Sequence, residues 1–164
     1  MKKVISVLIV SLLINLNLSA QEKPQLLPNF AIQDTDGNTF SEKDLAHNKY
    51  IVFVYFNPTC PHCQRAFKTL NENVAKLGNN MTVYGITVGD KGNSLFFMKK
   101  YAPALNERSN FKLLLEKDKA FTTVFGVERY PSIYLYSPDK KLLSFEQDEK
   151  KVLNFLGKIQ PVDR

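Results

Sequence analysis

The chain has 164 residues, of which 44% are hydrophobic, and a formal net charge of +6 at pH 7. This length and apolar content suffice for one globular domain with a packed core. The lysines and arginines are scattered and form no basic cluster, which argues against a nucleic-acid-binding protein. The two cysteines, Cys60 and Cys63, are too few for a disulfide framework, so we expect this pair to act through its own redox chemistry or as half a metal site.

The N-terminus is typical of a secretory signal peptide, which we assign to residues 1–20. Lys2 and Lys3 form a positive start, residues 4–14 are an apolar run, and a more polar end follows. The apolar run is shorter than the roughly 20 residues that a membrane-spanning helix needs. An uncleaved membrane anchor is the alternative interpretation. We therefore expect export to an oxidising compartment, the bacterial periplasm, where disulfide chemistry is common.

The segment after the signal peptide, residues 21–29, contains two prolines and is predicted to be a linker. The domain would then cover residues 30–164. Its first elements are two short strands, residues 30–33 and 38–40, because the Asp-Gly pair between them is a hairpin turn signal. Residues 41–45 are predicted to form a short capped helix.

The centre of the chain is a strand followed directly by a helix. Residues 50–56 are seven apolar residues without a break, which predicts a strand buried on both faces, as in a parallel sheet under helices. Residues 61–77 then place apolar side chains at spacings of three and four, which predicts a helix that Gly78 ends. The Cys-Pro-His-Cys sequence therefore lies where the buried strand becomes a helix.

This position assigns a role to each residue of the motif. The first turn of a helix has unpaired N–H groups and a partial positive charge, which stabilise a thiolate at Cys60 and make it the nucleophile. Pro61 fits the first helical position, where its missing N–H is harmless. His62 adds a second donor or positive charge beside the sulfur. Cys63 lies on the apolar face of the helix and is expected to be the buried, resolving thiol.

The second half of the chain predicts alternating strands and helices. A strand, a helix and a second strand in this order form a right-handed parallel crossover. Asp118 is expected to cap one helix and Gly126 to end it, and Pro103 is expected to end or bend the inserted helical segment. The predicted elements are a strand at 81–88, an inserted helical segment at 93–108, a strand at 111–115, a helix at 119–125, a hairpin of 132–136 with 141–146, and a last helix from Asp148 or Glu149 to Ile159.

This order of elements, with Cys-Pro-His-Cys at the strand-to-helix junction, resembles the thioredoxin fold over nearly all of the mature chain. It is most similar to the TlpA/ResA-type exported thiol-disulfide oxidoreductases, a redoxin (AhpC/TSA-like) group, through the N-terminal hairpin, the helical insertion and the stretch 125–132. The resemblance implies an α/β fold: three thioredoxin-like layers with a central mixed sheet, an N-terminal β-hairpin extension and a helical insertion. It also implies that Tyr130-Pro131 is a cis peptide, that Pro131 faces Cys60, and that Tyr130 contacts substrate.

The resemblance further implies an enzyme that exchanges disulfides with protein cysteines and acts as a reductant. Such an enzyme would need no cofactor, and a membrane redox partner would regenerate its dithiol. We expect a monomer that binds no nucleic acid.

The chain departs from the pattern of the family in several respects. Thr59 replaces the Trp that often precedes the first cysteine, and Val54 replaces the buried carboxylate of thioredoxin six residues before it. The proton acceptor for Cys63 is therefore undefined, and Glu116 and Glu128 are the candidates. The Pro-His pair is similar to that of the strongly oxidising periplasmic dithiol oxidase, so the motif and the scaffold predict opposite redox directions.

Four alternatives remain open from the sequence. The same site would serve a disulfide-donating oxidase, or it would hold an inert disulfide in an interaction domain. A copper- or zinc-binding module would use Cys60 and Cys63 with a histidine, and a four-ligand zinc site would need His47 and a carboxylate. A peroxidase of the peroxiredoxin kind needs Thr or Ser three residues before its cysteine, where this chain has Asn57.

Overall fold

The computed structural model describes residues 22–159, so the predicted signal peptide lies outside the described residues. A seven-stranded sheet in the order β2-β1-β5-β4-β3-β6-β7 forms the middle layer. The β3, β4 and β5 strands run parallel, while the outer strands pair antiparallel, so the predicted mixed sheet is confirmed. The strands are β1 (Ala31–Asp34), β2 (Thr39–Ser41), β3 (Tyr50–Phe56), β4 (Met81–Thr87), β5 (Phe111–Leu115), β6 (Ser132–Tyr136) and β7 (Leu142–Glu146).

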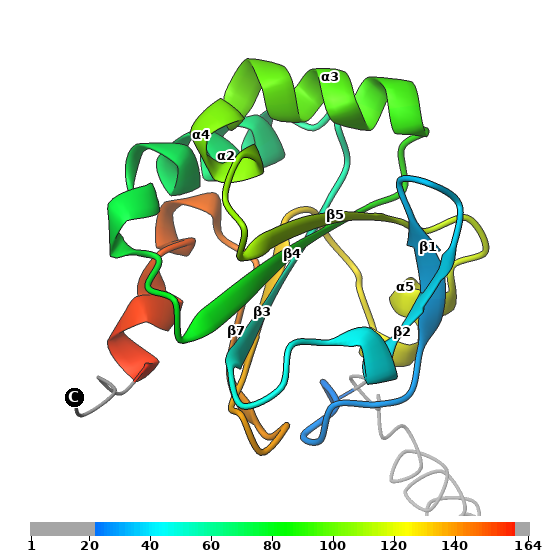
Figure 1. Cartoon of the computed structure of the whole chain (residues 1–164), viewed down its shortest axis with the longest axis vertical. Helices are drawn as coiled ribbons and strands as arrows, with labels where there is room; N and C mark the ends of the chain where they lie inside the picture. The colour runs from blue at the N-terminus through cyan, green and yellow to red at the C-terminus, as the bar shows by residue number, and fades with distance from the viewer. Residues whose placement is uncertain (1–21, 160–164) are drawn as a thin grey trace, which may run out of the picture.

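Helices cover both faces of this sheet, which gives the three layers that the resemblance implied (Figure 1). On one face lie α2 (Pro61–Glu72), α3 (Lys91–Tyr101), α4 (Pro103–Asn106) and the C-terminal 3₁₀ segments η3 (Glu149–Lys151) and η4 (Asn154–Lys158). On the other lie α5 (Ala120–Phe125) and η1 (Glu42–Asp44). A further 3₁₀ turn, η2 (Val74–Lys76), follows α2. No helix in residues 22–159 is long and apolar enough to span a membrane.

The central strand β3 divides two apolar cores. Its residues 51–56 are at most 3% exposed. Because side chains alternate along a strand, Val54 and Phe56 pack toward α2 and α3, whereas Phe53 and Tyr55 pack toward α5. Burial of β3 on both faces explains why its sequence is apolar without alternation, as predicted.

The α5 face is a cluster of aromatic rings. Phe121 and Phe125 stack with ring centroids 3.8 Å apart, and Phe53 meets both edge-on at 5.3 and 5.4 Å. Phe30, from the start of the N-terminal hairpin, meets all three rings at 5.8 Å. These contacts hold the N-terminal extension on the sheet.

The helix predicted over 61–77 is shorter than the apolar spacing suggests. It ends at Glu72, and Asn73 is its C-cap, with the Asn73 side chain donating to the carbonyl oxygen of Thr69 at 2.8 Å. The chain then continues as the 3₁₀ turn η2, after which Leu77 is still buried. The apolar spacing therefore continues past the point where the α-helical hydrogen bonds end.

Two other local predictions were wrong. Asp118 does not cap α5: the N-cap is Lys119, which has φ +54° and makes no side-chain cap. The predicted last helix is instead the two 3₁₀ segments η3 and η4, although Asp148 does accept from the backbone N–H of Lys150 at 2.9 Å. Packing of Val152 and Phe155 in the core decides the path of this segment more than helix propensity does.

Residues 23–27, inside the predicted linker, are attached to the domain. The backbone N–H of Leu27 donates to Lys140 at 2.8 Å, and that of Leu142 donates to Gln25 at 2.8 Å. The Lys23 ammonium donates to the Gly126 carbonyl at 2.5 Å and lies 5.1 Å from the centre of the Phe145 ring. This segment therefore packs beside β7 and the loop after α5.

The aromatic cluster gives a prediction for stability. Phe121→Ala removes a fully buried ring and should lower the free energy of unfolding by about 3–5 kcal/mol. Phe96→Ala, at a residue that is 64% exposed, should change it by less than about 0.5 kcal/mol. Urea denaturation of both variants measures the difference, and equal effects would contradict the assignment of Phe121 to the core.

Candidate active site

The Cys-Pro-His-Cys motif lies just after the end of β3, as predicted. Cys60 is the N-cap of α2 and Pro61 occupies the start of the helix. The Asn57 carbonyl accepts from the backbone N–H of Cys60 at 3.0 Å, and its side chain accepts from the N–H of Thr59 at 3.0 Å. These bonds turn the chain out of the strand and present Cys60 at the positive end of the helix.

The two thiols differ in environment. Both are free thiols in the structure; Cys60 is partly exposed, while Cys63 is completely buried in the core under α2. Burial, with a smaller contribution from Cys60, raises the pKa of the Cys63 thiol well above its ordinary value. Cys63 thus stays a neutral thiol at neutral pH, which suits the second cysteine in a two-step exchange.

A loop from the other half of the chain faces Cys60. The Tyr130–Pro131 peptide is cis, as the resemblance implied, and the Cys60 thiol lies 3.9 Å from the Tyr130 carbonyl oxygen, to which it donates. The Tyr130 residue is 38% exposed, and its ring stacks on the buried ring of Tyr55, with centroids 5.6 Å apart and planes at 16°. Tyr130 therefore remains partly open to solvent beside the thiol.

The buried side chain of Glu116 forms a hydrogen bond with Tyr55, the inner ring of this aromatic pair. Glu116 is 4% exposed and accepts hydrogen bonds from the Tyr55 hydroxyl, from the Thr122 N–H at 2.7 Å and from the Thr122 hydroxyl at 2.6 Å. Burial, and then Glu116, raises the pKa of the Tyr55 hydroxyl, so Tyr55 remains a donor. The network gives hydrogen-bond partners to carboxyl oxygens that would otherwise be costly to bury.

The structure separates the two candidate proton acceptors for Cys63. Glu128 is largely exposed and pairs with Lys23 at 3.2 Å. Glu116 is buried, and its hydrogen bonds join it to Tyr55 and Thr122 rather than to either cysteine. Neither carboxylate makes a hydrogen bond to Cys63 in the part of the chain that the structure describes, so a proton-accepting role for either stays a prediction.

His62 contacts charged side chains rather than the nearby thiol. Its Nδ1 lies 3.1 Å from the Glu149 carboxylate and 2.8 Å from the Arg65 guanidinium, which itself donates to Glu149 at 3.0 and 3.2 Å. His62, followed by Arg65, lowers the pKa of the Glu149 carboxyl from 4.5 to about 2. The sequence contained no signal for Glu149 as a site residue, because it is 84 positions from Arg65 and meets it only through packing of η3 on α2.

The histidine proposed for a zinc site lies elsewhere. His47 precedes β3 and the cysteines follow it, so the length of the strand separates them. Within residues 22–159, no group of three or more His, Cys, Asp or Glu side chains is placed to hold a metal ion. The four-ligand zinc set considered from the sequence is therefore not assembled.

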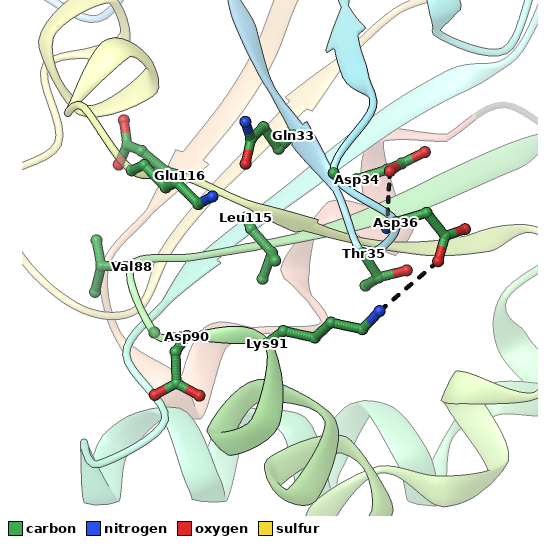
Figure 2. A pocket seen from close by; sticks show the side chains of 12 residues that line it. Gln33, Asp34, Thr35, Asp36, Val88, Asp90, Lys91, Leu115 and Glu116 are labelled. Atoms are coloured by element: carbon green, nitrogen blue, oxygen red, sulfur yellow. Dashed lines mark hydrogen bonds and ion pairs between the residues drawn. The ribbon is translucent and has the colours of Figure 1, made fainter.

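A cavity of about 650 Å³ opens between the β1–β2 turn and the start of α3 (Figure 2). Lys91 reaches across it to Asp36 at 3.8 Å. Gly89 in its wall packs on the active-site loop, since a Cβ there would lie 2.7 Å from Pro58. Glu116 lines this cavity, but neither cysteine does, so it is a neighbour of the dithiol and not its opening.

The mixed sheet, and the way it presents the dithiol opposite a cis-proline, place the chain in the thioredoxin-like class. The chain belongs to the AhpC/TSA family, whose model matches residues 24–145. The sequence matches no curated protein.

Solved structures share this fold at low sequence identity. A secreted Mycobacterium tuberculosis disulfide oxidoreductase homologous to Escherichia coli DsbE is 22% identical, with a TM-score of 0.64 over 79% of this chain and 96% of its own. The thioredoxin domain of a Bacteroides vulgatus thiol-disulfide oxidoreductase is 19% identical, with a TM-score of 0.65 over 85% and 98%. Copper-bound Arabidopsis thaliana ScoI is 16% identical, with a TM-score of 0.60 over 81% and 96%.

The difference in burial gives a prediction for thiol labelling. At neutral pH iodoacetamide should alkylate Cys60 and leave Cys63 unmodified, because Cys63 is buried and its raised pKa keeps it protonated. Mass spectrometry of the reduced protein should find a single label on the folded chain, and a label on both cysteines after unfolding in guanidinium. Equal labelling of both cysteines in the folded protein would contradict the assigned roles.

Proposed function

We propose that the protein is a thiol-disulfide oxidoreductase that exchanges disulfides with cysteines of other proteins. The observation that carries this proposal is the arrangement of Cys60: it is partly exposed, caps a helix N-terminus, and lies 3.9 Å from the carbonyl of a cis-proline loop. Membership of the AhpC/TSA family and the fold of the solved oxidoreductases support it.

The exchange takes place in two steps. The Cys60 thiolate attacks one sulfur of a substrate disulfide, forms a mixed disulfide and releases the other substrate sulfur as a thiolate, which takes up a proton. Cys63 then loses its proton and attacks the Cys60 sulfur, which releases the second substrate thiol. Two electrons pass to the substrate, and the enzyme is left with a Cys60–Cys63 disulfide.

The loop opposite Cys60 is the proposed peptide-binding surface. The Tyr130 carbonyl and the Pro131 ring would flank an extended substrate chain, and the exposed part of the Tyr130 ring would pack against a substrate side chain. Stacking on Tyr55 keeps this surface in place before the substrate binds. Pro61 contributes by starting α2 directly after the nucleophile.

We propose that the protein works outside the cytoplasm as a reductant. The sequence of residues 1–20 supports export, and the similar M. tuberculosis structure is that of a secreted protein. A membrane redox partner would return electrons to the Cys60–Cys63 disulfide after each turnover. The alternative direction, in which the disulfide form oxidises substrates, uses the same residues and differs in the reduction potential.

Cysteine substitutions test the assignment of roles. Cys60→Ser should abolish insulin reduction with dithiothreitol, since the nucleophile is lost. Cys63→Ser should keep the first step and accumulate a mixed disulfide through Cys60, visible on a non-reducing gel. Wild-type activity in the Cys60 variant would refute the proposed function.

The reduction potential decides the direction. We expect a value near or below about −250 mV in glutathione or dithiothreitol buffers, as for proteins that donate electrons. A value near about −120 mV would instead make the protein a disulfide donor. Counting free thiols after acid quenching gives the measurement.

A further inference from the structure

The C-terminal segment anchors the histidine of the motif. The Glu149 side chain is only 15% exposed and contacts both His62 and Arg65, whose side chains are 57% and 54% exposed. Glu149 starts η3, which directly follows its N-cap Asp148, so backbone structure sets its position. Two exposed side chains of α2 are thus held by one largely buried carboxylate.

Both contacts of His62 use the same ring nitrogen. When Nδ1 carries a proton, it donates to the Glu149 oxygen at 3.1 Å; when Nδ1 is unprotonated, it accepts from Arg65 at 2.8 Å. The ring therefore has a partner on this side in either protonation state. Among the described residues, no hydrogen bond or ion pair joins His62 to Cys60, whose sulfur contacts the Tyr130 carbonyl.

This geometry bears on the redox direction. A positive charge beside Cys60 stabilises its thiolate, which stabilises the reduced dithiol and makes the disulfide a stronger oxidant. Glu149 weakens that effect in two ways: it turns the ring toward η3, and its negative charge offsets the charge on an imidazolium. Arg65 lies in the same cluster and is neutralised by the same carboxylate.

We propose that Glu149 is a positioning residue that holds His62 away from Cys60 and so keeps the dithiol more reducing than its Pro-His pair alone would make it. The inference rests on the proposed function and deepens it. The Pro-His pair is typical of an oxidase, whereas the scaffold is typical of a reductant. The contact between η3 and α2 explains how the two occur together, because it limits the effect of the His62 charge on the Cys60 sulfur.

The test removes the charge of Glu149 with His62 present and absent. In Glu149→Gln, the equilibrium with glutathione should shift about tenfold toward the reduced dithiol, or about 30 mV for two electrons. The Cys60 thiolate, followed by its ultraviolet absorbance, should titrate at lower pH than in the wild type. In a His62→Ala background, adding Glu149→Gln should produce a clearly smaller change in both quantities, because only the Arg65 charge that Glu149 had neutralised remains to act.

Glu146→Gln is the matched control, since Glu146 lies on β7 and its carboxylate accepts from the Asn154 side chain rather than from His62. It should leave both quantities at wild-type values. An unchanged or higher titration pH in Glu149→Gln, or an equal shift without His62, would overturn the proposal. The thiolate titration needs no turnover, so it tests the role of Glu149 even if the protein fails to reduce insulin, a failure that would count against the proposed function alone.

Discussion

Burial of β3 on both faces governs the arrangement of the whole domain. Six consecutive side chains leave water there, each worth about 1.5–3 kcal/mol when a large apolar group is fully buried. Both faces must therefore be covered, by α2 and α3 on one side and by α5 on the other (Figure 1). Since β3 ends at Phe56 and α2 begins at Pro61, the start of α2 must lie at the carboxyl end of this central strand, where Cys60 is partly exposed to solvent.

The same strand supports the other half of the site. Alternation along β3 sends Tyr55 to the α5 face, where its ring stacks on Tyr130 and its hydroxyl donates to Glu116. Cys60 and the surface that faces it are therefore both positioned by one buried element. A peptide held by Tyr130 would meet Cys60 at a distance set by the core of the protein.

Charge around the dithiol depends on more than the two residues between the cysteines. His62 belongs to a cluster with Arg65 and Glu149, and Glu149 comes from the C-terminal part of the chain. The influence of a histidine on a nearby thiolate depends on where its ring points and on which charge accompanies it. A Cys-Pro-His-Cys motif can therefore have different redox properties on different scaffolds, because the neighbouring elements differ.

Local patterns in the sequence were enough to predict the strands at 50–56, 111–115 and 132–136 and the dithiol at a helix N-cap, because contiguous apolar runs and turn residues act locally. The three-layer α/β arrangement was predicted from the resemblance to thioredoxin-like proteins. Local patterns did not predict the early end of α2 or the two 3₁₀ segments in place of a last helix, where packing outweighed spacing. The support of Tyr55 by Glu116 and the contact of Glu149 with His62 became visible in the folded chain alone. Each pair joins residues far apart in the sequence, and its contact depends on how whole elements pack, which no local pattern records.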